Sequence, residues 1–152
     1  MPLIEKELIF VKRNFKDNIE ALSFLADQLK EKQKVKPTFK EKVLFREENY
    51  PTALSNDKLA VTIPHANWQE VRQSALAIAT LNKPVIFKNI TKPKQDLKVQ
   101  IIIMLAISQP KAEVKMLQKL TFLVQNQKYL SNLLAYKRPE GLSKYIKQIL
   151  GF

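Results

Sequence analysis

The chain has 152 residues, of which 45% are hydrophobic and 26% charged, and its formal net charge is +12. This size and composition predict one globular domain over residues 1–152, with enough apolar side chains for its own core. There is no cysteine and only one histidine, which excludes thiol chemistry, disulfides and a poly-histidine metal site. The only glycines are Gly141 and Gly151, so a Gly-rich phosphate loop is also excluded.

The basic residues indicate a solvated surface. All but four of the 26 are lysines, which are scattered along the chain, whereas proteins that read base edges rely on arginine. A nucleic-acid interface over the lysines between Lys30 and Lys42 is the weaker alternative. The N-terminal segment has no apolar stretch typical of a signal peptide, and the most apolar run, Val99–Ile107, is too short to span a bilayer. We therefore expect a cytoplasmic protein with no nucleic-acid partner and no membrane insertion.

The N-terminal third predicts one strand and two helices. The apolar run within residues 7–12 is typical of a strand. Asp17 can cap a helix whose apolar residues recur at helical spacing as far as Leu29. Thr38 and Glu41 form a capping-box pattern for a second helix that should end near Glu48.

The rest of the chain predicts strands followed by helices. Strands are expected over Leu59–Ile63, Ala75–Leu81, Pro84–Phe87 and Val99–Ile107, with a tight turn at Asn82-Lys83-Pro84 and a polar loop over Thr91–Gln95. Beyond Pro110 the apolar residues take helical spacing and predict helices over 114–124, 129–134 and 139–149. The order of elements predicts a layered α/β (α+β) domain in which a mixed β-sheet is flanked by helices.

The single histidine, His65, is the first candidate for chemistry. It follows Ile63-Pro64 at the end of a predicted strand. Because Pro64 lacks an amide donor, strand pairing should end before the ring, which we expect at the sheet's edge in contact with solvent. Neutral imidazole is a competent nucleophile near pH 7. A lone histidine in this place can also be merely structural.

Arg46 is the second candidate, at the end of the second predicted helix. Its guanidinium can bind phosphate oxygens with two parallel hydrogen bonds. It can equally be a cation that favours a helix C-terminus, and spacing alone does not decide between the two.

Two motifs together resemble a known family. Arg46-Glu47-x-x-Tyr50-Pro51-Thr52, followed by Val61-x-Ile63-Pro64-His65-Ala66, is similar to the IIA (EIIA) domain of the bacterial sugar phosphotransferase system (PTS), of the fructose/mannitol type (type 2). Residues 81–87 and 102–107 are similar to the galactitol-specific branch. The resemblance covers the whole chain and implies a three-layer α/β/α sandwich.

The resemblance also implies a function. In this family the histidine takes a phosphoryl group from the phosphocarrier protein HPr and passes it to a cysteine of an EIIB component, which serves a membrane EIIC. By this resemblance His65 is the phosphorylated nucleophile and Arg46 the phosphoryl stabiliser. No metal, nucleotide or other cofactor is implied, because positioning and charge neutralisation do most of the catalysis. The expected role is uptake of a galactitol-like sugar, and the alternative is a stand-alone regulatory phosphorylation sensor.

The chain departs from the family's pattern at two positions. Glu113 stands where mannitol-type members have a second histidine. Its carboxylate could accept a hydrogen bond from one ring nitrogen of His65 and orient the ring, or it could be only a favourable charge in a helix first turn. Ala53 stands where relatives usually have glycine, and we expect no positive φ there.

Overall fold

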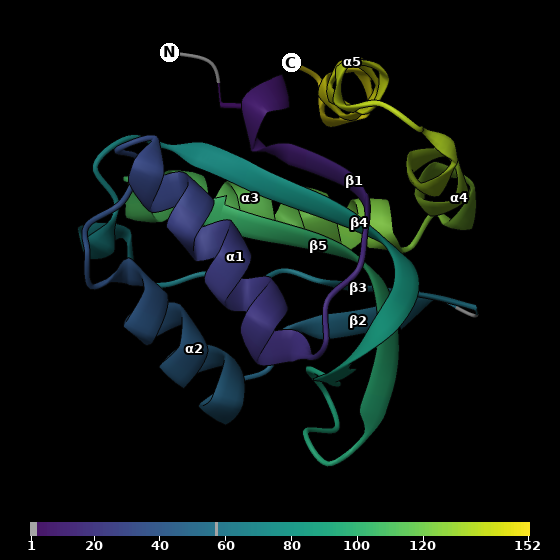
Figure 1. The fold of residues 1–152 in the computed structure, drawn as a ribbon, viewed down its shortest axis with the longest axis horizontal. Helices are drawn as coiled ribbons and strands as arrows, with labels where there is room; N and C mark the ends of the chain where they lie inside the picture. The colour runs from purple at the N-terminus through teal and green to yellow at the C-terminus, as the bar shows by residue number, and fades with distance from the viewer. Residues whose placement is uncertain (1–2, 57) are drawn as a thin grey trace.

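The computed structural model describes residues 3–56 and 58–152 and folds them into a five-stranded mixed sheet with helices on both faces (Figure 1). The strands are β1 (Ile9–Arg13), β2 (Ala53–Asn56), β3 (Leu59–Thr62), β4 (Ala75–Lys88) and β5 (Asp96–Ala106), in the spatial order β1-β4-β5-β3-β2. The β1/β4 and β3/β5 pairs are parallel, and the other two pairs are antiparallel. This confirms the predicted single mixed sheet.

The helices form two outer layers. They are α1 (Asn18–Glu31), α2 (Phe39–Asn49), α3 (Pro110–Val124), α4 (Gln127–Ala135) and α5 (Pro139–Leu150), with two short 3-10 turns, η1 (Lys6–Leu8) and η2 (Trp68–Glu70). Figure 1 shows α1 and α2 over one face of the sheet and α3, α4 and α5 over the other. No helix in the described ranges is long and apolar enough to cross a membrane.

Alternating side chains of the central strands build two separate cores. In β4, Ala75 and Ala77 pack with the apolar residues of α1 and α2, whereas Leu76 and Ile78 pack with those of α3, α4 and α5. The period of two is what a strand covered on both faces requires. The result is the three-layer α/β/α sandwich that the family resemblance implies.

The two N-terminal helices begin differently from each other. Asp17 caps α1 as predicted, because its carboxylate accepts a hydrogen bond from Glu20 N (2.9 Å). The predicted capping box at α2 is wrong. Thr38 makes no side-chain cap, and its hydroxyl instead donates to the Glu70 carboxylate in η2.

The predicted turn at Asn82-Lys83-Pro84 is also wrong, because β4 runs through it without reversing. The pairing of β4 with β5 shifts register between Thr80 and Val85, and the three turn-forming residues sit in that irregular stretch. Pro84 is tolerated there because an irregularity relieves it of a ladder hydrogen bond. Asn82 Nδ2 donates to Lys12 O (2.8 Å) and ties this stretch to the end of β1.

The sequence did not predict β2, a strand of four residues at the edge of the sheet. It pairs with β3 from Ala53 opposite Thr62 to Asn56 opposite Leu59. Ala53 is fully buried and is not among the described residues with positive φ, as expected. Its carbonyl accepts from Ile90 N (2.9 Å), so β2 also anchors the loop between β4 and β5. That loop forms one wall of the site described next.

Candidate active site

His65 lies beyond the end of β3, inside the sheet. It forms a parallel bridge with Leu105 of β5, whose amide donates to Pro64 O (2.9 Å). Only 6% of the residue's surface is exposed. The expected position at the sheet's edge is therefore wrong, whereas the expected contact with solvent is limited to one cavity. Pro64 lacks an amide donor, but its carbonyl still accepts, and this keeps the chain alongside β5.

A backbone hydrogen bond orients the imidazole ring. His65 Nδ1 lies 2.9 Å from Ile63 O. Because a carbonyl only accepts, Nδ1 carries the proton of the neutral ring, and the lone pair is left on Nε2. Burial lowers the pKa of His65 below its ordinary value of 6.5, and the Arg46 charge lowers it further, while the Ile63 hydrogen bond opposes both. The ring is thus neutral, with one free nitrogen, at pH 7.

A cavity of about 420 Å³ gives His65 access to solvent. Its walls come from α2, the segment before β2, the β4–β5 loop and α3, and they include Arg46, Tyr50, Ile90 and Leu117. Most of this wall is apolar, so a phosphoryl group would meet polar atoms mainly from Arg46 and His65.

Arg46 is exposed in the last turn of α2 and shares the cavity with His65. Its positive charge lowers the pKa of His65 and acts on that of Glu113. One guanidinium therefore sits close enough to influence both of the other residues selected from the sequence.

Glu113 lies half-buried in the first turn of α3. Burial raises the pKa of its carboxyl, and Arg46 opposes this shift. Its Oε2 is buried and makes no hydrogen bond to any described residue. Likewise, no hydrogen bond joins Glu113 to His65 in the described structure, because Ile63 O occupies Nδ1. The ring is thus oriented by the main chain, and Glu113 lies in the electrostatic field of Arg46.

Sequence reasoning missed a buried polar cluster beneath the site: Glu47, Thr52 and Thr62. The Glu47 carboxylate accepts from Thr52 N (3.0 Å) and from the hydroxyls of Thr52 (2.9 Å) and Thr62 (3.3 Å). A signal was present, because Glu47 follows Phe39 and Val43 at spacings of four and so falls on the buried face of α2. A carboxylate on an apolar helix face is unusual enough to mark a site.

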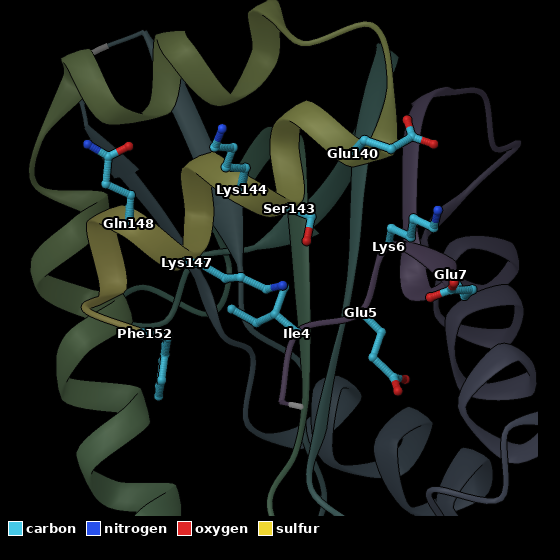
Figure 2. Close-up of a pocket in the computed structure, with 10 residues that line it drawn as sticks. All are labelled: Ile4, Glu5, Lys6, Glu7, Glu140, Ser143, Lys144, Lys147, Gln148 and Phe152. Carbon is cyan, nitrogen blue, oxygen red and sulfur yellow. The ribbon is translucent and has the colours of Figure 1, made fainter. Parts of the chain in front are cut away.

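A larger hollow, of about 720 Å³, lies between the N-terminal segment and α5 (Figure 2). Its charged side chains have both signs: Glu5, Lys6, Glu7, Glu140, Lys144 and Lys147. None of the residues selected from the sequence lines it, so the chemistry belongs to the smaller cavity at His65.

Comparison with known proteins identifies the family. The family model for the "Phosphoenolpyruvate-dependent sugar phosphotransferase system, EIIA 2" matches residues 2–149. The chain belongs to this EIIA family. As an EIIA domain it is a phosphotransferase component that carries a phosphoryl group.

Two curated relatives are similar to this chain, one along most of its own length and the other over a short part of a longer protein. The chain is 23% identical over 137 residues to the galactitol-specific EIIA component of Escherichia coli (strain K12), covering 90% of this chain and 91% of that protein. It is 27% identical over 153 residues to a multiphosphoryl transfer protein of Shigella flexneri, covering 99% of this chain but only 18% of that protein. The chain therefore corresponds to one EIIA-sized part of that longer relative.

A solved structure confirms the EIIA fold. The complex of enzyme IIA-mannitol and phosphorylated enzyme IIB-mannitol from Escherichia coli matches with a TM-score of 0.74 and 19% identity, covering 98% of this chain and 99% of that one. In that complex the IIA protein is bound to a phosphorylated IIB. EIIA domains thus partner with EIIB components.

Proposed function

We propose that His65 is the phosphoryl carrier of this EIIA domain, with Nε2 as the attacking atom. The observation that supports this is the Nδ1 contact with Ile63 O, which leaves the Nε2 lone pair free in a solvent-connected cavity. Nε2 attacks the phosphorus of phospho-HPr, the bond to the donor breaks, and its electron pair returns to the donor. A cysteine thiolate of EIIB then attacks the same phosphorus, and the P–N bond breaks with its electron pair returning to His65.

Arg46 stabilises the transferring group. Phosphohistidine places negatively charged oxygens in the cavity, and the nearby guanidinium offsets that charge. Arg46 is exposed and lines the same cavity, so it can follow the phosphoryl group from donor to acceptor. Its effect is greatest while charge is spread over the transferring oxygens.

Glu113 acts on the site through its charge in this proposal. A carboxylate within the electrostatic influence of Arg46 reduces the net positive field felt by His65 and by a phosphoryl group. The support is the shared influence of Arg46 on the pKa of Glu113 and of His65. This role differs from the expected hydrogen bond to the ring, which Ile63 makes instead.

Exposed apolar side chains around the cavity favour protein partners, with HPr as the phosphoryl donor and EIIB as the phosphoryl acceptor. Two further hollows adjoin the cavity, one sharing Arg46 and Tyr50 and the other sharing Leu117 and Thr121. The exposed apolar residues that line the three hollows are Phe45, Tyr50, Ile90, Val114 and Phe122. Such a patch is typical of a surface that a partner covers.

We infer a cytoplasmic EIIA of residues 1–152 that serves uptake of a galactitol-like sugar through EIIB and a membrane EIIC. Support for the sugar class is the likeness to a galactitol-specific EIIA component. The alternative, a stand-alone regulatory sensor, would be phosphorylated at the same histidine but would not pass the group to an EIIB cysteine. No cofactor and no nucleic acid take part in either reading.

The test is incubation with phosphoenolpyruvate, enzyme I and HPr, followed by intact-mass measurement and then by addition of the EIIB component. One phosphoryl group should appear, be labile to acid, and disappear when EIIB is added. His65→Ala should abolish the mass increase. An unchanged mass in the wild type, or an increase that persists in His65→Ala, would sink the carrier proposal, and phosphorylation that EIIB cannot remove would favour the regulator.

A further inference from the structure

The buried carboxylate of Glu47 connects three separate segments. Glu47 lies on the inner face of α2 with only 7% of its surface exposed. Its Oε1 accepts from Thr52 N (3.0 Å) in the segment before β2, and from the Thr62 hydroxyl (3.3 Å) at the end of β3. Its Oε2 accepts from the Thr52 hydroxyl (2.9 Å).

The Thr52 hydroxyl continues this network toward the nucleophile. Thr52 Oγ1 accepts a hydrogen bond from Ile63 N (3.1 Å). Ile63 O in turn accepts from His65 Nδ1 (2.9 Å). The carboxylate and the hydroxyl thus lead to the backbone of Ile63, whose amide and carbonyl belong to successive peptide groups joined at its Cα, and the carbonyl leads on to the imidazole of His65.

The chemistry of each group fixes the direction of this path. Thr52 Oγ1 lies 2.9 Å both from Glu47 Oε2 and from Thr62 Oγ1. An ionised carboxylate offers only acceptors and is a stronger acceptor than a hydroxyl, so we assign the single hydroxyl proton of Thr52 to Glu47 and treat Thr62 as a donor. The lone pairs of that oxygen then face the Ile63 amide and hold the peptide group that precedes Ile63 in one orientation. This holds the chain on the N-terminal side of the Ile63 carbonyl, and the carbonyl faces Nδ1 and requires a proton there.

Burial of this carboxylate is costly for folding. Burial raises the pKa of Glu47 above its ordinary value of 4.5, although hydrogen bonds from Thr52 and Thr62 oppose the shift. An apolar residue in line with Phe39 and Val43 would avoid that desolvation. A buried carboxylate that destabilises the fold, yet is connected by hydrogen bonds to the reactive side chain, is typical of a residue kept for function.

We propose that Glu47 and Thr52 are positioning residues that hold His65 in its Nδ1-protonated tautomer and so keep Nε2 free to attack. This inference rests on the proposed phosphocarrier function and extends it to two residues that do not touch the phosphoryl group. Without the network, the Ile63 amide loses its hydrogen bond, and the backbone next to the Ile63 carbonyl is held less firmly.

The central experiment compares Thr52→Val, which removes the hydroxyl at nearly constant volume, with Thr52→Ser, which keeps it. The tautomer is read from the ¹⁵N chemical shifts of the imidazole, and His65 is the only histidine in the chain. The wild type and Thr52→Ser should show a protonated Nδ1. Thr52→Val should show a mixture of tautomers and a phosphorylation rate lower by roughly 10-fold to 100-fold, as when groups that orient metal-bound histidines are removed.

Thr80→Val is the matched control. Like Thr52, Thr80 is buried, with 1% of its surface exposed, and its hydroxyl accepts a hydrogen bond from a backbone amide, Lys12 N (3.0 Å). Thr80 lies in β4, however, which is separated from β3 by β5. This variant loses an equivalent hydrogen bond and should keep the wild-type tautomer and rate. If Thr52→Val fails to fold, Glu47→Gln is measured instead. The glutamine amide can donate a hydrogen bond to Thr52 Oγ1, so the Thr52 hydroxyl proton no longer has to point to residue 47. This variant should therefore also show a mixture of His65 tautomers.

The outcomes separate the two proposals. A folded Thr52→Val protein with the wild-type tautomer and rate would overturn the positioning role and leave Glu47 as a structural support of the turn. A wild type that accepts no phosphoryl group would overturn the proposed function. The tautomer measurement needs no phosphoryl donor, so it still tests the network in that case.

Discussion

The two ring nitrogens of His65 have different environments: Nδ1 is hydrogen-bonded to the Ile63 carbonyl, and Nε2 remains free. Burial and Arg46 lower the pKa of the ring below 6.5, so the folded state disfavours imidazolium. His65 therefore contributes stability above pH 6.5, and this contribution is lost as the pH falls through the lowered folded-state pKa.

We predict that the rate of phosphoryl acceptance stays constant as the pH is lowered to 6.5 and falls only below it. The physical reason is that Nε2 keeps its lone pair until imidazolium forms. Titration of His65 by proton NMR, with stopped-flow phosphorylation over the same pH range, checks this. A ring that titrates above 6.5 would contradict it.

Arg46→Ala should leave the fold intact, because the side chain is exposed, but it should slow phosphoryl transfer. The expected loss is roughly 10²-fold to 10³-fold, the size typical of removing one group that stabilises developing charge. Arg46→Lys should recover only part of it, since lysine lacks the planar pair of donors. Single-turnover kinetics with phospho-HPr measure both variants, and a wild-type rate for Arg46→Ala would reduce Arg46 to a helix-end cation.

Glu113→Gln and Glu113→Ala should both lower the pKa of His65, because each removes a nearby negative charge that favours imidazolium. Burial lowers the pKa of His65 and raises that of Glu113, and the Arg46 charge, which adds to the first shift and opposes the second, is the link between them. The same NMR titration provides the measurement. Identical His65 pKa values in the wild type and in both variants would leave Glu113 as a favourable charge in the first turn of α3.

At the scale of elements, α2 carries a functional residue on a face that packing alone would fill with apolar side chains. The pKa of Glu47 is raised, so the folded state binds its proton more tightly than the unfolded state does. Its contribution to stability is full below pH 4.5 and is lost as the pH rises through the raised pKa.

Glu47→Gln should therefore have a higher free energy of unfolding than the wild type at pH 7, and the difference should shrink as the pH approaches 4.5. The amide accepts from Thr52 N as the carboxylate does, but carries no charge to desolvate. Urea unfolding at several pH values gives the comparison. A Glu47→Gln protein that is less stable than the wild type at pH 7 would show that the hydrogen bonds outweigh the cost of burying the charge.

Periodicity predicted the helices and most strands, because apolar spacing reports which faces are buried. The errors arose where the deciding contact lies far away in the sequence. Thr38 has a capping pattern, yet its hydroxyl bonds Glu70, 32 residues later. Asn82-Lys83-Pro84 has turn chemistry, yet β5 and Lys12 hold it in an extended strand. At the site, motifs selected His65 and Arg46 separately, but the link through Thr52 and Ile63 exists only in three dimensions.

At the scale of the whole molecule, the sheet brings three distant segments to one opening. α2, the β4–β5 loop and α3 each contribute an exposed apolar side chain near the His65 cavity: Phe45, Ile90 and Val114. These residues are separated in sequence, so only the fold makes them one surface.

Phe45→Ser should slow phosphoryl transfer from HPr by lowering kcat/KM, because docking loses apolar contact area. Stability should change by no more than about 0.5 kcal/mol, as is usual for an exposed position. Phe152→Ser is the matched control, since Phe152 is exposed to a similar extent but lies at the far hollow beside α5. Equal rates for the two variants would place the docking surface elsewhere.

The atom that orients His65 belongs to the main chain, and this has a consequence for mutational tolerance. No side-chain replacement at position 63 can delete the Ile63 carbonyl, so that position should accept any residue that fills the core and stays extended. Selection on the catalytic geometry must then act on the neighbours that aim the carbonyl. A saturation library scored for sugar uptake should show broad acceptance of aliphatic residues at position 63 and a narrow choice, threonine or serine, at position 52.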